Sequence, residues 1–270
     1  MSSRHNGLEA HGRFEMKFVI ASLSRCGSTA VTRVLSSSPA VKIAYEPTFF
    51  AQGTSLARIR WRAFQCLRRH DGLKHVWDPN GWPFRNPDHV SSLDALAGSD
   101  ELIAPNRAVL DRADRIVLLR RRNRFDRILS DLWGQQTNLW GHNPDRGHDA
   151  SEVRRYRAEA KRRAPSPIDP DVFAWYIQNA RNWENRIIDC LRPSAARMFF
   201  YEDLFQADGA DARFSAWSEM FEWLEVEPDF LSPGVQDIVA PESKLNSLDI
   251  YERIPNYREL KEHFGEQIAA

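Results

Sequence analysis

The sequence is poor in cysteine and has no long apolar run, and each absence excludes a class of protein. Three cysteines, at positions 26, 66 and 190, are scattered through 270 residues. They are too few for a disulfide framework and favour a reducing compartment, so we expect a cytoplasmic protein. A membrane-spanning helix needs about 20 consecutive apolar residues. No stretch approaches that length, so we expect no membrane span.

An excess of charge of one sign is also missing. The chain has 37 basic and 37 acidic residues, and its formal net charge is +0. This balance argues against a protein that coats nucleic acid or another polyanion, so any recognition of anions must be local. We also find no convincing cluster of metal ligands, because His142 and His148 lie in a loop rich in Gly and Asn. We therefore expect no nucleic-acid partner and no metal.

What the sequence does contain is an alternation of apolar runs and helical patterns. The runs predict strands at 17–22, 41–45, 73–77, 115–120 and 197–201. Helical spacing of apolar residues predicts helices at 29–37, 123–134, 169–191 and 212–225. Strands alternating with helices predict an α/β fold with a mostly parallel central sheet of about five strands, flanked by helices.

The domain organisation that we predict is simple. No internal repeat and no linker divides the chain, so we expect a single domain over residues 16–270 after a loose tail over 1–15. The segment 141–165 has the composition of an insertion and contains a basic run at 153–163. That run has two interpretations, a solvated helix face or a lid near an anionic ligand.

The stretch SLSRCGST, residues 22–29, joins the first predicted strand to the first predicted helix. Ligands of open α/β sheets bind at the carboxyl ends of the strands, where a helix N-terminus offers free N–H groups and a positive dipole end. Arg25 adds a charge, and Gly27 allows close approach of the backbone. Ser28 and Thr29 can donate hydroxyls to phosphate oxygens. The stretch is therefore a candidate phosphate loop; the alternative is an ordinary turn with a serine cap.

Two related phosphate chemistries do not fit the spacing of this loop. A Walker loop reads G-x-x-x-x-G-K-[ST], and both the first glycine and the lysine are missing here, which disfavours a Mg-dependent nucleotidase. A thiolate phosphatase needs five residues between its cysteine and arginine, whereas six separate Cys26 from Arg33. We therefore interpret Cys26 as a small packing residue.

A second candidate anion site lies in DRIVLLRRRNRFDRILS, residues 114–130. A buried strand runs directly into Arg120, Arg121 and Arg122, an arrangement that costs free energy unless the guanidinium groups face an anion or water. Ser130 lies about two helical turns beyond Arg122. If the helix folds back beside the strand, both side chains can flank one phosphate. Two phosphate sites at one sheet edge suit a ligand with phosphates at both ends of a ribose.

Four segments together resemble the sulfotransferases that use 3′-phosphoadenosine 5′-phosphosulfate (PAPS). SRCGST resembles the family's loop for the 5′-phosphosulfate, although the family usually has serine in place of Cys26. RRNRFDRILS resembles its 3′-phosphate motif, with Arg122 and Ser130 matching the arginine and serine. FFYEDLF (199–205) and SKLNSLDIYERIPNYREL (243–260) are similar to a strand-plus-turn segment and to the C-terminal segment that closes over the nucleotide. The resemblance covers most of residues 16–264 and implies a P-loop-like fold.

The resemblance also implies a reaction and its residues. PAPS is the co-substrate, 3′,5′-bisphosphoadenosine (PAP) is the product, and a sulfuryl group passes to a hydroxyl of a small-molecule or glycan acceptor. YEPTFF (45–50) looks most like the bacterial carbohydrate branch, which includes trehalose and Nod-factor sulfotransferases, and this implies Glu46 as general base. Arg25 and the loop would stabilise the leaving phosphate. Cys26, Gly27, Ser28 and Thr29 would hold the 5′-phosphate, and Lys244 is a weaker candidate for the nucleotide.

Several alternatives stay open from the sequence. LKHVWDPNGWPF (73–84) loosely resembles the lysine–histidine strand end of cytosolic aryl and steroid sulfotransferases, so His75 competes with Glu46 as base. The segments 46–53, 75–85 and 133–150 are expected to form the acceptor pocket, with four candidate tryptophans, Trp77, Trp82, Trp133 and Trp140. A PAP- or PAPS-binding protein without activity, or a nucleotide kinase with a degenerate loop, remain alternative functions. The identity of the acceptor and the oligomeric state do not follow from the sequence.

Overall fold

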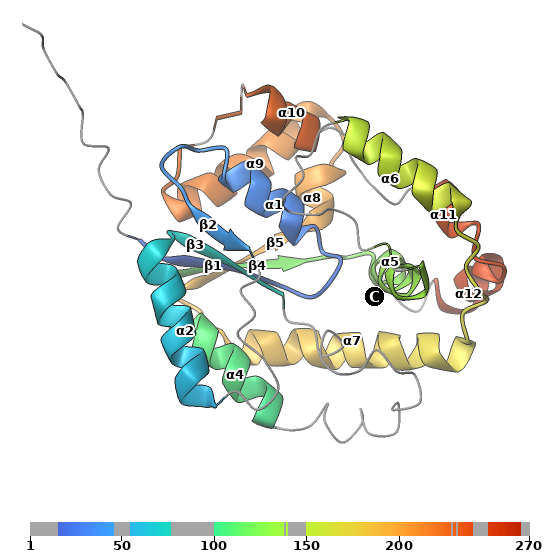
Figure 1. The fold of residues 1–270 in the computed structure, drawn as a ribbon, viewed down its shortest axis with the longest axis horizontal. Helices are drawn as coiled ribbons and strands as arrows, with labels where there is room; N and C mark the ends of the chain where they lie inside the picture. The colour runs from blue at the N-terminus through green and yellow to red at the C-terminus, as the bar shows by residue number, and fades with distance from the viewer. Residues whose placement is uncertain are drawn as a thin grey trace, which may run out of the picture.

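The computed structural model describes residues 16–45, 55–76, 100–137, 139, 150–227, 229–230, 232–239 and 248–265. Within these ranges the chain forms an α/β fold with a central five-stranded sheet between layers of helices (Figure 1). All neighbouring strands pair in parallel, in the order β2-β3-β1-β4-β5. The predicted α/β fold with a central sheet flanked by helices is thus confirmed, and the sheet is entirely parallel; the P-loop-like character stays a prediction.

The strands are short, and β1 and the middle of β4 are apolar and buried, as strands covered on both faces must be, whereas the edge strand β5 exposes Arg197 and Met198. They are β1 Phe18–Ser22, β2 Ile43–Tyr45, β3 Gly72–Val76, β4 Arg115–Arg120 and β5 Ala196–Phe200. Every residue of β1 is buried, and β1 lies at the centre of the sheet. Ser22 pairs with Leu119, so the segments that follow β1 and β4 leave the sheet side by side.

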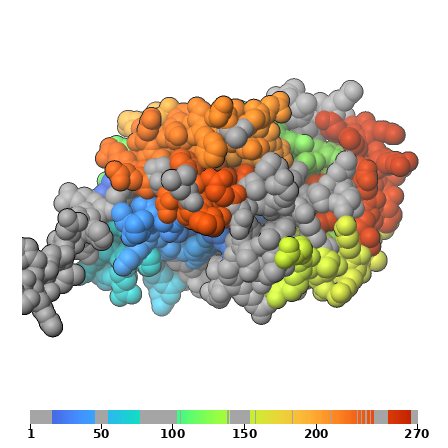
Figure 2. Space-filling view, turned by 90° about the horizontal axis from the view of Figure 1, so that it is seen from above, coloured from blue at the N-terminus to red at the C-terminus, as the bar shows by residue number. Residues whose placement is uncertain are grey.

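Helices cover both faces of this sheet. On one face lie α1 Ser28–Leu35, α8 Tyr201–Phe205, α9 Ala210–Leu224 and α10 Pro233–Val239. On the other lie α2 Leu56–Arg69, α4 Asp100–Leu110 and α7 Pro170–Cys190 (Figure 1). Figure 2 looks down on the first of these faces, where α9 in orange lies beside α1 in blue.

The chain that leaves β1 enters α1 on one face, whereas the chain that leaves β4 returns to β5 through α7 on the other. The carboxyl ends of β1 and β4 therefore form a topological switch point, the place where ligands bind in open α/β sheets. The two candidate anion segments of the sequence begin at these two strand ends.

A second, smaller core lies beyond this edge of the sheet. It joins α5 Arg124–Thr137, α6 Ala150–Arg162 and the first part of α7 to α11 Leu248–Tyr251 and α12 Tyr257–Phe264. The ring centroids of Phe125 and Phe173 are 5.2 Å apart, and those of Phe173 and Phe264 also 5.2 Å. These aromatic contacts fix the C-terminal helices against α5.

Candidate anion site at the carboxyl edge of the sheet

The loop between β1 and α1 is a compact turn with two residues in the left-handed region, Arg25 at φ 64° and Gly27 at φ 82°. Gly27 is the N-cap residue of α1 and has no side chain that could provide a cap hydrogen bond. The first turn of α1 also contains no acidic residue. The positive end of this helix is therefore not neutralised from within the helix, as expected of a site for an anion.

Gly27 is required by space as well as by backbone conformation. A Cβ atom at this position would come within 2.6 Å of the Tyr201 ring, which lies at the start of α8. Tyr201 in turn packs on Phe205, with ring centroids 4.9 Å apart. The loop is thus pressed against a rigid aromatic pair, which fixes its shape before any ligand binds.

A lysine reaches this loop from the neighbouring strand. Lys74 lies on β3 opposite Ile20 of β1, and its Nζ donates a hydrogen bond to Thr29 Oγ1 over 2.7 Å. Lys74 is 4% exposed. The buried ammonium group adds positive charge at the N-terminus of α1, where the helix dipole is also positive. Lys74 belongs to the segment LKHVWDPNGWPF, and nothing in the spacing of the sequence indicates that it meets Thr29.

Helix α5 brings a serine to the same loop. Arg25 Nε donates to Ser130 Oγ over 2.8 Å, although 105 positions separate the two residues. Ser24 Oγ donates to the buried carboxylate of Asp131 over 2.6 Å, and Arg127 Nη1 donates to the carbonyl oxygen of Ser24 over 3.4 Å. The structure therefore unites the loop of the first candidate site with the serine of the second.

The three consecutive arginines each meet a carboxylate of the protein itself. Arg120 Nη2 lies 2.6 Å from Glu184 Oε2, and Arg124 Nη2 shares that oxygen at 3.0 Å. Arg121 is buried, with Nη2 3.3 Å from Asp126 Oδ2 and Nε 4.0 Å from Glu202 Oε1. These ion pairs offset the cost of the cluster. The run of arginines is thus not in itself evidence of a bound anion.

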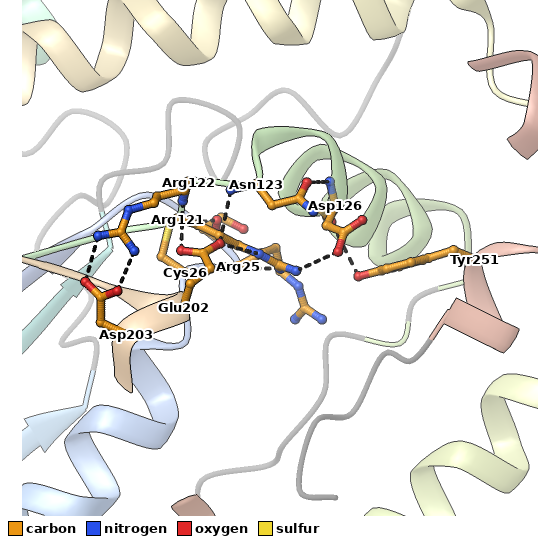
Figure 3. A network of polar contacts seen from close by, with 10 residues as sticks. Arg25, Cys26, Arg121, Arg122, Asn123, Asp126, Glu202, Asp203 and Tyr251 are labelled. Carbon is orange, nitrogen blue, oxygen red and sulfur yellow. Dashed lines mark hydrogen bonds and ion pairs between the residues drawn. The ribbon is translucent and has the colours of Figure 1, made fainter. Parts of the chain in front are cut away.

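Arg122 turns away from Ser130 and toward α8. Its two terminal nitrogens donate to the two oxygens of Asp203 over 2.5 and 2.7 Å, as Figure 3 shows. The guanidinium carbon also lies 4.0 Å from the centroid of the Phe200 ring. Arg122 does not contact Ser130 in this arrangement, and the predicted joint contact of the pair with a 3′-phosphate stays a prediction.

Glu202 occupies the N-terminus of α5. Its carboxylate oxygens accept the backbone N–H groups of Arg122 and Asn123 over 2.9 and 3.0 Å (Figure 3). The side chain of Asn123 accepts the N–H of Asp126 over 2.9 Å and so caps the helix. Of the helices that follow β4 and β1, α5 is therefore neutralised by a carboxylate of the protein, whereas α1 has no acidic residue in its first turn and lies close to two cations, Arg25 and Lys74.

Cys26 is a packing residue, as we interpreted it from the sequence. Its side chain is 1% exposed, and burial raises the pKa of its thiol to about 12. A thiol of that pKa is almost entirely protonated near neutral pH and is a poor nucleophile. Below it lies a cavity with room for about one water, lined by Leu23, Leu118, Glu184 and Ile187 among others.

His75 lies on the opposite face of the sheet from Lys74, because successive residues of a strand alternate in direction. It is 4% exposed, and its Nε2 is 2.7 Å from Asn106 Oδ1 on α4. An imidazole in this position is held by α4 on the face away from α1. The structure therefore does not bring His75 to the loop, and its role as base stays a prediction.

Other predicted site residues lie outside the described residues. These are Glu46, Lys244 and three of the four candidate tryptophans, Trp77, Trp82 and Trp140. The fourth, Trp133, is fully buried in the second core, so it packs α5 rather than lining a pocket. Among the described residues, no group of three or more His, Cys, Asp or Glu side chains could hold a metal ion.

Comparison with known proteins does not assign the chain to a family. No family model matches the chain, and no curated protein matches it. Within the described ranges, no helix has both the length and the apolar character that crossing a bilayer demands.

Proposed function

We propose that the chain is a PAPS-dependent sulfotransferase that transfers a sulfuryl group to a hydroxyl of a carbohydrate or natural-product acceptor. The observation that carries the proposal is the 2.8 Å contact between Arg25 and Ser130. These residues come from the two segments that resemble the 5′- and 3′-phosphate motifs of the family. Their contact supports a single nucleotide that spans both segments, and such a ligand has phosphates at both ends of its ribose.

The electrostatics of the loop support an anionic leaving group. In the proposed reaction, the acceptor oxygen forms a bond to sulfur while the bond between sulfur and the 5′-phosphate oxygen breaks. The electron pair of that bond moves onto the phosphate of PAP. Lys74, Arg25 and the N–H groups of α1 would stabilise this developing charge, as donors do in an oxyanion hole. Thr29, which already accepts a hydrogen bond from Lys74, would hold the 5′-phosphate in place.

The acceptor must lose a proton as the new bond forms. β2 ends at Tyr45, and Glu46 is the next residue in the sequence; we assign it as the general base, as the resemblance implies. His75 is the second choice, because it would first have to exchange its hydrogen bond with Asn106. A cytoplasmic location belongs to the same proposal and is supported by the three cysteines, all of which are free thiols.

The test combines binding and turnover. Purified protein should bind PAP, and with PAPS and a panel of hydroxyl acceptors it should release PAP. Glu46→Gln should abolish release and keep PAP binding, whereas Glu222→Gln, at an exposed position on α9, should change neither. Failure to bind PAP would refute the proposed sulfotransferase function. Tight binding of PAP without transfer to any acceptor would favour the non-catalytic alternative, and Mg-dependent binding of ATP would favour the kinase.

A further inference from the structure

Helix α2 exposes most of the large apolar side chains that the structure leaves in contact with solvent. Four such side chains are exposed among the described residues, and three of them lie on this helix: Leu56 at 40%, Trp61 at 59% and Phe64 at 43%. The rings of Trp61 and Phe64 contact each other, with centroids 5.8 Å apart. Isolated exposed apolar residues are ordinary, but a contiguous group on one helix marks an interaction surface.

The helix is held in the fold by its other side. Ile59, Ala63 and Leu67 are buried at i, i+4, i+8 spacing, and α2 packs along α4 on the lower face of the sheet (Figure 1). Trp61 lies two residues after Ile59, and Phe64 lies one residue after Ala63, so the two rings share a side of the helix that differs from the buried stripe. The aromatic pair is therefore not part of the core-facing stripe, whereas Leu56, three residues before Ile59, lies at the exposed N-terminal end of that stripe. The pair is additional apolar surface on an element that already has its packing partner.

The charge of α2 is of one sign. Its sequence, LARIRWRAFQCLRR, has five arginines and no acidic residue, in a chain whose charges balance overall. Arg60 and Arg68 lie one turn before and one turn after Phe64, so they bracket the aromatic pair. No ion pair joins Arg58, Arg60, Arg68 or Arg69 to a carboxylate in the part of the chain that the structure describes. This contrasts with the arginines at the end of β4, which are paired with carboxylates.

We infer that α2 is a docking surface for an anionic lipid bilayer, on which the protein lies peripherally. Tryptophan and phenylalanine beside arginines are the composition of helices that lie in the membrane interface. There the aromatic rings enter the acyl boundary while the guanidinium groups reach anionic headgroups. An acidic protein partner would satisfy the arginines but would not require the exposed aromatic pair. The surface is separate from the nucleotide site and does not depend on the proposed function.

The experiment measures binding of the full chain to sedimented vesicles. Vesicles of phosphatidylcholine with about a third phosphatidylglycerol should retain the protein, and vesicles of phosphatidylcholine alone should retain much less. Trp61→Ala with Phe64→Ala should lower the partition coefficient at least tenfold, on the order expected for two large apolar side chains. Arg60→Gln with Arg68→Gln should lower it about thirtyfold on anionic vesicles and leave binding to neutral vesicles unchanged.

Matched controls test whether the loss of any exposed arginine or apolar side chain weakens vesicle binding. Arg154→Gln with Arg181→Gln removes two exposed arginines on α6 and α7, and Met198→Ala removes the exposed apolar side chain of β5. Both controls should bind vesicles as the parent protein does. Equal binding to neutral and anionic vesicles, no binding to either, or no loss in the aromatic variant would overturn the inference. A dimer in solution that disappears in the aromatic variant would instead assign the surface to a second copy of the chain.

Discussion

Lys74 of β3 and Thr29 of α1 are joined by a 2.7 Å hydrogen bond that places an ammonium group at the N-terminus of a helix. The phosphate loop of nucleotidases carries its lysine within the loop, and this loop has none. Here a lysine enters from the side, from the strand adjacent to β1. The register of β1 and β3 makes this possible, because Lys74 stands opposite Ile20, two residues before the end of β1.

Lys74→Met should impair turnover more than folding. The unbranched methionine fills much of the same buried space but brings no charge to the leaving phosphate. Loss of one preorganised donor of this kind costs roughly 100-fold in turnover. We expect a loss of that size in PAP release and weaker binding of PAP by titration calorimetry. Lys42→Met, at an exposed position in the turn before β2, is the control and should match the parent protein. Equal turnover in both variants would show that Lys74 does not stabilise the leaving phosphate.

Gly27→Ala should destabilise the protein and disrupt the loop. Two costs combine there, a backbone at φ 82° and a Cβ only 2.6 Å from the Tyr201 ring. A non-glycine residue in the left-handed region costs about 1 kcal/mol or more. The clash adds a cost that only movement of the ring can relieve.

Gly209→Ala is a control for the backbone cost alone. Gly209 has φ 87° and ψ 153°, a region that L residues adopt even less readily than the left-handed region of Gly27, but no heavy atom lies within 4 Å of an added Cβ. Both variants should lower the midpoint of thermal unfolding, but only Gly27→Ala should weaken PAP binding. Unchanged PAP affinity in Gly27→Ala would contradict a role of this loop in binding the nucleotide.

The sequence predicted the sheet well because buried parallel strands leave a strong local signal. All five strands fall within two residues of the predicted bounds, and the four predicted helices exist. The prediction did not include α2, α4, α8, α10, α11 or α12. The pattern of α2 is obscured by arginines and by Trp61 and Phe64, which lie outside its buried stripe. The spacing of apolar residues along the sequence does not show which of them face solvent.

The candidate site was predictable only in part. Strand ends and glycines identified the loop, since a turn that needs φ > 0 has a local signature. Contacts between distant segments have no such signature. The pairing of Arg122 with Asp203 and the approach of Lys74 to Thr29 depend on how β4, β5 and β3 are arranged in the sheet. The same holds for Arg25 and Ser130, whose contact was foreseen only as a common location at one sheet edge.

The thiol of Cys26 should resist alkylation in the folded protein. Its pKa of about 12 leaves it protonated at pH 8, and burial denies access to the reagent. Mass spectrometry after iodoacetamide treatment should find Cys66, which is only half-buried, modified first. Cys26 should react only after denaturation. Rapid modification of Cys26 in the native protein would contradict its burial under the loop.

The same thiol should make stability fall at high pH. The unfolded chain releases the Cys26 proton near pH 9.0, whereas the folded chain keeps it until about pH 12. Between these values the unfolded state binds fewer protons, so the free energy of unfolding decreases as pH rises. Urea denaturation at pH 8 and pH 10.5 should show this decrease. Cys26→Ala should show a smaller decrease over the same interval, and an identical decrease in both proteins would contradict the assignment.

Asp203→Asn should strengthen binding of PAP by releasing Arg122. The pair is half exposed at both residues, so its loss should change the free energy of unfolding by less than about 1 kcal/mol. If Arg122 binds the 3′-phosphate, Asp203 competes for the same two nitrogens, and a neutral amide competes less well. Arg122→Gln should act in the opposite sense and remove the preference for PAP over adenosine 5′-monophosphate, which lacks the 3′-phosphate. The control is Glu225→Gln, which breaks the ion pair with Arg115 at the other end of β4. If the parent protein and the three variants showed the same preference for PAP, Arg122 would pair with Asp203 and take no part in binding the 3′-phosphate.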